Sequence, residues 1–133
     1  MLEINSIDQD ARVLITIVDI KGDIDASNYD VFQSQTEKII TDGARYILLN
    51  LQEVPYMSSA GLRVIHNLFN KLRELHKDAN DDELRKKMSA GVYKSPYIKV
   101  VNLSPRVKEA FELGGFETYI ETYDDVSHAL NSF

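Results

Sequence analysis

The sequence predicts an α/β protein with a mixed, mostly parallel β-sheet of about five strands and helices packed against it. Three observations support this fold class. Short apolar runs at Val13–Val18 and Tyr46–Leu49 have the length and the side chains of buried strands. Residues 62–75 show a strong helical period, and further strands and helices alternate along the chain. Such an alternation requires parallel strands joined by right-handed crossovers, while a hairpin at the N-terminus adds one antiparallel strand.

The first two strands are expected to form that hairpin. Leu2, Ile4 and Ile7 suggest a short N-terminal strand, and Asp8–Asp10 has the composition of a turn. The run Val13–Val18 is β-branched and almost entirely apolar, so we expect it to be a central strand. Because so short a turn joins them, the two strands should be antiparallel.

A loop and a helix follow this hairpin. Lys21–Asn28 is rich in turn formers, and either Ser27 or Asn28 is placed to cap the next helix. That helix is predicted at about Tyr29–Thr41, and Gly43 supplies the left-handed residue that ends it. The side chains expected to face the core are Val31 or Phe32, then Ile39 and Ile40.

The best-defined feature is a strand that leads into a helix through a pair of serines. Pro55 breaks the strand because proline cannot donate to a β-ladder, and a helical period begins directly after residues 58–61. Ser58 and Ser59 therefore stand where the strand has ended and the helix begins. The side chains that share one helical stripe are Leu62, Ile65, Leu68, Phe69, Leu72 and Leu75.

A serine at a helix start has two possible roles. The first turn has backbone N–H groups without intrahelical partners and carries the positive end of the helix dipole. A hydroxyl there can cap these groups, or it can carry a phosphate that they tolerate well. No Glu or Gln stands three residues after Ser58 or Ser59, so the capping-box pattern is absent and both roles stay open.

Residues 77–95 connect this helix to the next strand. Their first part is acidic and a basic stretch follows, which indicates a solvated loop with a short helix at Asp82–Met88, capped by Asp81. The alternative is a docking element for a partner. Neither the composition nor the length of the segment separates the two.

The C-terminal third continues the alternation. Tyr97–Val101 is the next predicted strand, and Ser104 and Pro105 occupy the N-cap and the first position of a helix that ends at Gly114. Phe116–Ile120 is predicted to be a last short strand, followed by a terminal helix. The side chains expected to face the core from these two helices are Val107, Ala110, Phe111, Leu113, Val126, Ala129, Leu130 and Phe133.

Composition limits the class of protein. With 133 residues, of which 44% are hydrophobic, the chain fits a single domain, residues 1–133, whose helix-to-strand connection at 77–95 is unusually long. The net charge of −6 argues against nucleic acid or a membrane surface as a direct partner. The chain has no cysteine, no basic and apolar leader, and no apolar run of the roughly 20 residues that cross a bilayer. These features predict a cytoplasmic protein.

Neither an enzyme nor a cofactor or metal site is predicted. Asp19, Asp23 and Asp25 suggest the magnesium site of a response-regulator receiver, but that fold needs an aspartate where this chain has Asn50. Glycine motifs that bind phosphate groups are absent. The histidines are too scattered for a nucleophile–base pair or a metal site, and we expect them on the surface. They are His66, His76 and His128.

Functional residues are expected at the carboxyl ends of the parallel strands, where the loops of such sheets gather. Lys21–Asn28 and Tyr56–Gly61 both follow such strand ends. We therefore expect the two loops to lie side by side, with Asp23 and Asp25 close to the serine pair.

Four motifs in order carry a resemblance to a known family. They are Gly22-Asp23-Ile24-Asp25, Ile47-Leu48-Leu49-Asn50-Leu51, Tyr56-Met57-Ser58-Ser59-Ala60-Gly61-Leu62, and the helix from Ser104-Pro105 to Gly114. With them the chain resembles a STAS domain and, within that class, the bacterial anti-sigma factor antagonists, over about residues 11–133 apart from the longer segment at 77–95. The resemblance implies a STAS-like sheet and a switch protein rather than a catalyst.

The resemblance also implies partners and a switching residue. In that family the unphosphorylated antagonist binds an anti-sigma factor that is also a serine kinase, and so frees the sigma factor. The kinase phosphorylates the antagonist, and a PP2C-type phosphatase removes the phosphate. Aligning Gly61-Leu62 with the family Gly-Leu puts the acceptor at Ser59, with Ser58 in place of the family Asp and as a rival acceptor. The partner-binding residues so implied are Gly22, Asp23, Asp25, Tyr56, Met57, Ser58, Ser59, Ala60, Gly61 and Arg63.

A second interpretation belongs to a different class of function. A STAS domain can serve as a constitutive scaffold in a stress-signalling assembly, or as an accessory subunit of a transporter, without control by phosphorylation. The loss of the family Asp, where this chain has Ser58, is compatible with such a role.

Overall fold

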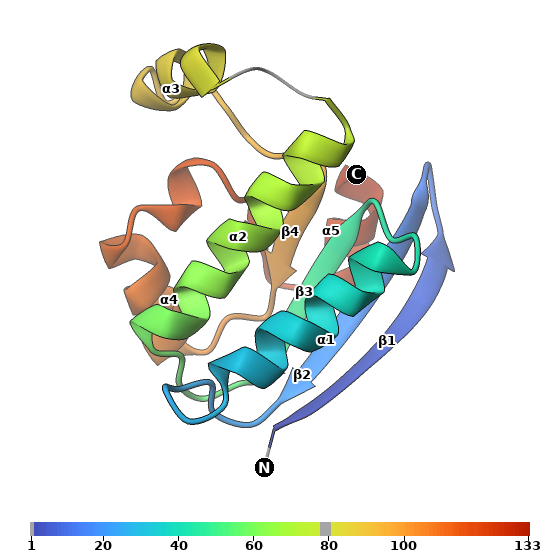
Figure 1. The fold of residues 1–133 in the computed structure, drawn as a ribbon, viewed down its shortest axis with the longest axis vertical. Helices are drawn as coiled ribbons and strands as arrows, with labels where there is room; N and C mark the ends of the chain where they lie inside the picture. The colour runs from blue at the N-terminus through green and yellow to red at the C-terminus, as the bar shows by residue number, and fades with distance from the viewer. Residues whose placement is uncertain (1, 78–80) are drawn as a thin grey trace.

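The computed structural model describes residues 2–77 and 81–133 as a five-stranded sheet with helices on both faces (Figure 1). β1 pairs antiparallel with β2, and the other neighbours in the order β1-β2-β3-β4-β5 are parallel. The predicted fold class is therefore confirmed. The strands are β1 (Glu3–Asp10), β2 (Leu14–Lys21), β3 (Ile47–Glu53), β4 (Ile98–Val101) and β5 (Thr122–Tyr123). The helices are α1 (Tyr29–Thr41), α2 (Ser59–Leu75), α3 (Asp81–Ser89), α4 (Pro105–Leu113), the 3-10 helix η1 (Phe116–Thr118) and α5 (Val126–Ser132).

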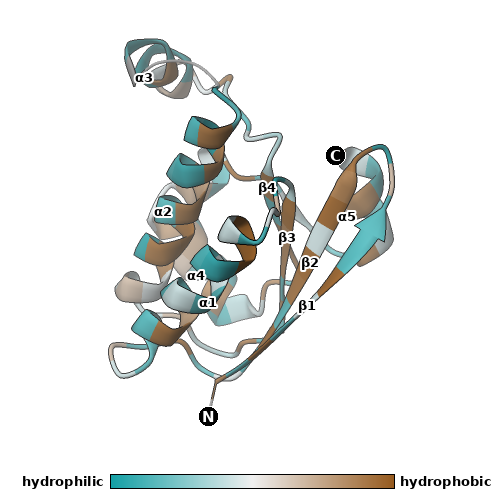
Figure 2. Ribbon diagram, turned by 45° about the vertical axis from the view of Figure 1, so that its right-hand side comes forward, coloured by the Kyte–Doolittle hydropathy of each residue, from teal (hydrophilic) through white to brown (hydrophobic). Residues whose placement is uncertain are grey.

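Two apolar clusters hold the layers together. The larger cluster lies between the sheet and α1, α2 and α4, which cover one face in Figure 2, and it contains Phe32, Phe69 and Phe111. The smaller cluster lies on the opposite face under α5, where Leu48 packs with Ala129. Because β3 contributes to both clusters, its buried residues are apolar on both sides, as expected for an interior parallel strand.

A buried lysine fastens α5 to the sheet. The side chain of Lys99 is almost fully buried, and its ammonium group donates to the backbone carbonyl of Ser132 at 2.9 Å and to its hydroxyl at 3.0 Å. The carboxylate of Glu121 lies 3.2 Å from the same nitrogen. The ring centroid of Phe133 is 5.0 Å away. The positive charge thus sits at the C-terminal end of α5, where the helix dipole favours it.

Replacing Lys99 by methionine is expected to lower the free energy of unfolding by about 1–2 kcal/mol, since the apolar stem is kept while the charged hydrogen bonds are lost. Urea unfolding of the two proteins measures this difference. Lys108→Met, at an exposed position on α4, is the matched control and should change stability by less than about 0.5 kcal/mol. Equal losses in the two variants would contradict the role given to Lys99.

The N-terminal hairpin confirms the antiparallel pairing but corrects the position of the turn. β1 continues through the predicted turn to Asp10, which pairs with Leu14, so the chain reverses at residues 11–13. Asp8 accepts a hydrogen bond from the hydroxyl of Thr16 at 2.9 Å, which extends the contact between the strands. Ile7, a member of the predicted apolar pattern, is 61% exposed because no helix covers it.

The predicted last strand at Phe116–Ile120 is wrong. Gly115 has φ +74 and directs the chain into the 3-10 helix η1, where Phe116 stacks on Phe111 with 5.4 Å between ring centroids. The fifth strand comes later, at Thr122–Tyr123. The aromatic side chain of Phe116, which favours a β-strand, packs against another ring here instead of belonging to a β-ladder.

Most of the predicted inward stripes are confirmed, with two exceptions. Leu75 and Leu113 are 43% and 82% exposed, and each is the last residue of its helix. In α1 the choice between Val31 and Phe32 falls on Phe32, which is fully buried, while Val31 is 37% exposed. The spacing of apolar residues shows which face of a helix is buried. It does not show where the helix extends beyond the core, so apolar residues at a helix end can be exposed.

The connection at 77–95 is more than a solvated loop. α3 contains the predicted helix at Asp82–Met88, and Leu84 and Tyr93 are buried as members of the larger apolar cluster. Residues 78–80 lie outside the described residues, as does the side chain of Asp81, the predicted cap of this helix. In Figure 1, α3 stands beyond the C-terminal end of α2.

The prediction that all three histidines lie on the surface is correct for one of them only. His128 is exposed, but His76 is half-buried and stacks on Tyr97 with 3.8 Å between ring centroids. His66 is also half-buried, and its Nδ1 lies 2.8 Å from the hydroxyl of Tyr119 while its Nε2 lies 3.2 Å from the amide nitrogen of Asn70. An amide nitrogen only donates, so Nε2 accepts, and the neutral ring donates its Nδ1 proton to Tyr119.

Stability should fall as the pH drops below about 6.5, the ordinary pKa of histidine. Burial, and next the nearby Arg73, hold the pKa of His66 below that value in the folded protein. The unfolded chain therefore binds a proton more readily, and the stabilisation present above pH 6.5 is lost through the interval down to the folded pKa. Thermal unfolding against pH measures the slope, which should be smaller in His66→Gln. His128→Gln, at an exposed position, should keep the slope of the unmodified protein.

Candidate functional site

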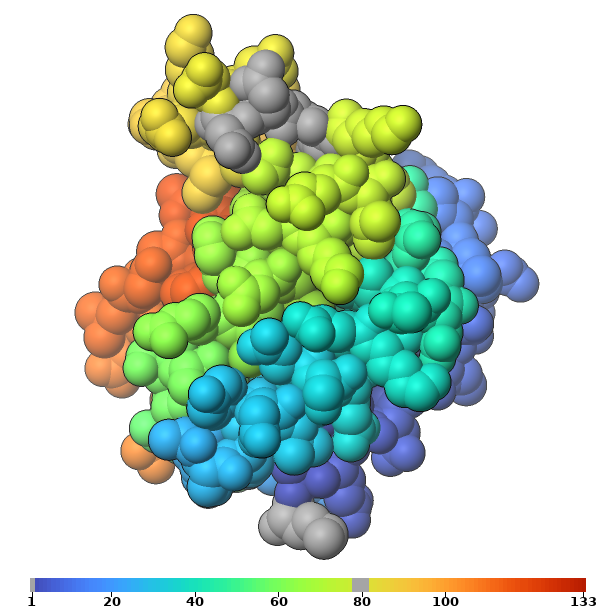
Figure 3. Space-filling view, in the orientation of Figure 1, coloured from blue at the N-terminus to red at the C-terminus, as the bar shows by residue number. Residues whose placement is uncertain are grey.

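The β2–α1 loop and the β3–α2 turn lie side by side, as predicted. The N–H of Ile24 donates to the carbonyl of Tyr56 at 3.0 Å, and the N–H of Ser58 donates to the carbonyl of Ile24 at 2.8 Å. These bonds form a short parallel bridge between Ile24 and Met57 beyond the ends of the two strands. In the space-filling view of Figure 3, the start of α2 (green) meets the loop before α1 (blue) on the visible face. The two loops therefore form one continuous surface.

The β2–α1 loop is fixed by its own polar side chains. Asp25 accepts from the backbone N–H of Ser27 at 2.9 Å and from the Ser27 hydroxyl at 2.5 Å. The hydrogen bond from the Ser27 hydroxyl, and next that from its N–H, lower the pKa of Asp25, so its carboxylate stays charged. Asn28 precedes α1 as predicted, but its side chain bonds to Asp25 N–H and to the carbonyl of Asp23 instead of capping the helix. Asp23 itself is exposed.

Ser58 and Ser59 differ in position and in exposure. Ser58 is the N-cap of α2, has extended backbone angles, and accepts from the N–H of Gly61 at 3.5 Å. Its side chain is half-buried. Ser59 is the first residue of the helix and is exposed. The hydroxyl of Ser59 thus stands at the positive end of the helix dipole on the surface of the protein.

Two of the predicted partner-binding residues are buried and position the turn. Met57 is 3% exposed, and Gly61 is also buried. A Cβ on Gly61 would lie 2.6 Å from Met57 Cγ and 2.8 Å from Ile24 Cγ2, so only glycine allows α2 to approach the β2–α1 loop this closely. Ala60 is half-buried and Arg63 is exposed. Gly22, with φ +114, donates its N–H to the carbonyl of Glu53 at 2.9 Å and closes the other end of the loop pair.

The structure adds one residue to this surface that the sequence does not indicate. The guanidinium carbon of Arg106, in the first turn of α4, lies 5.0 Å from the ring centroid of the half-buried Tyr56. The predicted N-cap residue Ser104 donates its hydroxyl to the carbonyl of Val54 at 3.0 Å, which fastens the start of α4 to the β3–α2 turn. No local pattern indicates a contact between residues 50 positions apart.

Two carboxylates of the rejected magnesium site, those of Asp19 and Asp25, accept hydrogen bonds from neighbouring side chains. The side-chain amide of Asn50 donates to Asp19 at 2.9 Å, and Asn102, in a left-handed conformation with φ +61, donates to the Asn50 oxygen at 3.4 Å. Within residues 2–77 and 81–133, no group of three or more histidine, aspartate or glutamate side chains is placed to hold a metal ion. In the same ranges, no helix is both long enough and apolar enough to pass through a bilayer.

Fold and site together describe a mixed α/β domain with an exposed serine at a helix start beside an acidic loop. The family model of the STAS domain matches residues 6–76, just over half of the chain, and the protein belongs to this family.

Named relatives agree with this assignment. Over 97 residues the chain is 25% identical to BtrV of Bordetella bronchiseptica, named as a candidate anti-sigma factor antagonist; the match covers 73% of this chain and 67% of BtrV. An anti-sigma factor antagonist from Mycobacterium paratuberculosis shares the fold, with TM-score 0.69, 17% identity, and coverage of 98% and 93% of the two chains. The phosphorylated form of SpoIIAA from Bacillus has TM-score 0.60 at 13% identity, with coverage of 96% and 97%. The fold is thus that of anti-sigma factor antagonists.

Proposed function

We propose that the protein is a phosphorylation-switched anti-sigma factor antagonist. In its unphosphorylated form it binds an anti-sigma factor with serine kinase activity and so releases a sigma factor. Phosphorylation of Ser59 by that kinase turns binding off, and a PP2C-type phosphatase restores it. The protein acts by binding and catalyses no reaction. It works in the cytoplasm as one STAS domain of residues 1–133, in which α3 belongs to the long connection.

The position of Ser59 carries this proposal. Its hydroxyl is exposed at the first residue of α2, whereas Ser58 is half-buried and serves as the cap. A kinase needs an acceptor that it can reach without unfolding the helix, and Ser59 meets that requirement better than its rival. The structural neighbour SpoIIAA has been solved in an unphosphorylated and in a phosphorylated form, so a protein of this fold can carry a phosphate.

The mechanism follows from where the charge would be placed. A phosphate adds about −1.5 to −2 charges at the helix start, where free N–H groups and the helix dipole tolerate it. The same dianion inside an interface would have to be desolvated, which is costly unless the partner supplies cations. Asp23 and the charged Asp25 already make the adjoining loop acidic. Binding is thereby switched off while the fold of the antagonist stays the same.

The partner surface in this proposal is the exposed part of the loop pair. The exposed Asp23, Ser59 and Arg63 supply its side chains. The half-buried residues that complete it are Asp25, Tyr56, Ser58 and Ala60. Gly22, Met57 and Gly61 contribute by fixing the backbone beneath.

The proposal is tested by incubating the protein with ATP and a candidate anti-sigma factor kinase, followed by mass spectrometry. We expect a single phosphate on Ser59, loss of kinase binding after modification, and recovery after treatment with the PP2C-type phosphatase. Ser58→Ala should still be modified and Ser59→Ala should not. An unmodified protein that binds its partner constitutively would instead support the scaffold function.

A further inference from the structure

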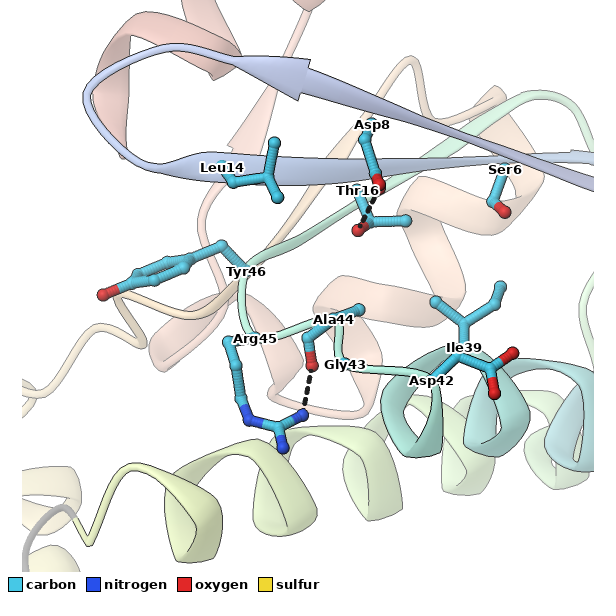
Figure 4. Close-up of a pocket in the computed structure, with 10 residues that line it drawn as sticks. All are labelled: Ser6, Asp8, Leu14, Thr16, Ile39, Asp42, Gly43, Ala44, Arg45 and Tyr46. Carbon is cyan, nitrogen blue, oxygen red and sulfur yellow. Dashed lines mark hydrogen bonds between the residues drawn. The ribbon is translucent and has the colours of Figure 1, made fainter.

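A hollow of about 440 Å³ lies between the β1–β2 hairpin and the end of α1 (Figure 4). It forms at the amino ends of β2 and β3, whereas Ser59 follows the carboxyl end of β3. It exists because no helix within residues 2–77 and 81–133 covers this face of β1, so Ser6 and Asp8 stay open beside the end of α1. Its volume falls in the range that binds small ligands, roughly 300–1,000 Å³.

The walls of the hollow are apolar on two sides. Leu14 is 54% exposed at the start of β2, although it points toward the same face as the buried Val18. Ile39 at the end of α1 and Tyr46 before β3 are half-buried. In Figure 4, Leu14 lies on the hairpin side of the hollow and Ile39 on the helix side, while the ring of Tyr46 points away from both, toward His76 and Tyr97. An aliphatic chain of a few carbon atoms would cover apolar area here that water now contacts.

The polar groups of the hollow favour a cation. Asp8 lines it from β1, and its carboxylate is held by the hydroxyl of Thr16, a residue that is 5% exposed. Asp42 lines it from the opposite side, and its carboxylate is paired with Lys38 at 2.8 Å. The C-terminal end of α1 adds the negative end of a helix dipole.

The chain itself shows that this helix end accepts a cation. Arg45 donates to the carbonyls of Ile40 at 3.0 Å and Ala44 at 2.8 Å. In Figure 4 its guanidinium is turned away from the hairpin, so the carboxylate of Asp8 is left on the side of the hollow that Arg45 does not reach.

We propose that this hollow binds an alkylammonium group, with its charge beside Asp8 and its aliphatic chain against Leu14 and Ile39. The group is either a free aliphatic amine or the lysine side chain of a partner. Because the site stands at the other end of the strands, its occupancy does not depend on Ser59 or on the proposed antagonist function.

The test uses n-butylammonium as the probe and the backbone amide NMR signals of the full chain as the readout. We expect saturable shifts at Ser6, Asp8, Leu14 and Ile39, with no such response to butanol or butyrate. Asp8→Asn should weaken binding at least about tenfold through loss of the charged contact. The matched control is Asp10→Asn, the same change on the same strand and face but outside the hollow, which should bind as the unmodified protein does.

Asp42→Asn is a second variant at an exposed helix end, and it should weaken binding even if Asp8→Asn folds poorly. Butanol shifting the same signals as strongly, or unchanged affinity in both aspartate variants, would overturn the proposal. A comparison of the acetylated, amidated peptides Gly-Lys-Gly and Gly-norleucine-Gly shows whether the alkylammonium group comes from a free amine or from a lysine side chain. Tighter binding of the lysine peptide than of butylammonium assigns the site to a partner lysine, and tighter binding of butylammonium assigns it to a free amine.

Discussion

Ser59→Asp is expected to weaken binding to the cognate kinase at least about 100-fold, equivalent to about 2.7 kcal/mol, while Ser59→Ala binds as tightly as the unmodified protein. The added carboxylate stands at an exposed helix start beside an acidic loop, so the interface would have to bury it near like charges. Its effect on the fold should be small, because a negative charge in the first turn interacts favourably with the helix dipole. Isothermal titration calorimetry with the purified kinase measures both affinities.

Two matched variants separate charge from size and position. Ser59→Asn has nearly the same shape as Ser59→Asp without the charge, and it should retain most of the affinity. Ser58→Asp places a carboxylate one residue earlier, at the N-cap, where it can accept from Gly61 N–H as the serine does. It should keep the fold and lose less affinity than Ser59→Asp, because the cap bond holds its carboxylate against the helix end. If Ser59→Asn lost as much affinity as Ser59→Asp, steric exclusion rather than charge would explain the switch.

Gly61→Ala is expected to lower the free energy of unfolding by about 2–3 kcal/mol, even though alanine is the better helix former. The new methyl group would overlap Met57 Cγ and Ile24 Cγ2, which are packed in the core. Relief requires α2 to move away from the β2–α1 loop, so partner binding should weaken as well. Urea unfolding and the same titration measure the two losses.

A double-mutant cycle with Met57 shows whether the loss of stability in Gly61→Ala comes from this overlap. Met57→Ala removes the atom that the new Cβ would approach most closely. The double variant should therefore cost less than the sum of the two single variants, by about 0.5–3 kcal/mol. Strictly additive costs would show that the two side chains do not compete for the same space.

The sequence was most informative where local physics and tertiary packing agree. The apolar run at Ile47–Leu49 and the helical stripe after Gly61 place the strand, the turn and α2 correctly, and the crossover rule places the two loops together. The strand predicted at Phe116–Ile120 failed because the conformation of Gly115 and the contact between Phe116 and Phe111 decide that segment. Both are tertiary effects that β-propensity does not contain.

The residues of the candidate site that belong to sequence motifs could be predicted, and those placed by long-range contacts could not. The loop aspartates and the serine pair follow from strand ends and the family resemblance. That Ser58 caps α2 while Ser59 is exposed could be seen only in the structure. Arg106 reaches Tyr56 only because α4 is fastened to the β3–α2 turn, a placement set by contacts far apart in sequence. The hollow at the end of α1 could not be predicted either, because it depends on how the helices are placed over the strands.

The uncovered outer strand also bears on how the molecule behaves in concentrated solution. β1 forms one border of the sheet, and its outward side has no neighbouring strand among residues 2–77 and 81–133. Glu3, Asp8 and Asp10 give this strand three exposed acidic residues, so two molecules meeting border to border would repel each other. Replacing these three residues by neutral ones would remove the repulsion and leave the ladder of β1 open to extension. Self-association through β1 is therefore expected to increase in such a variant.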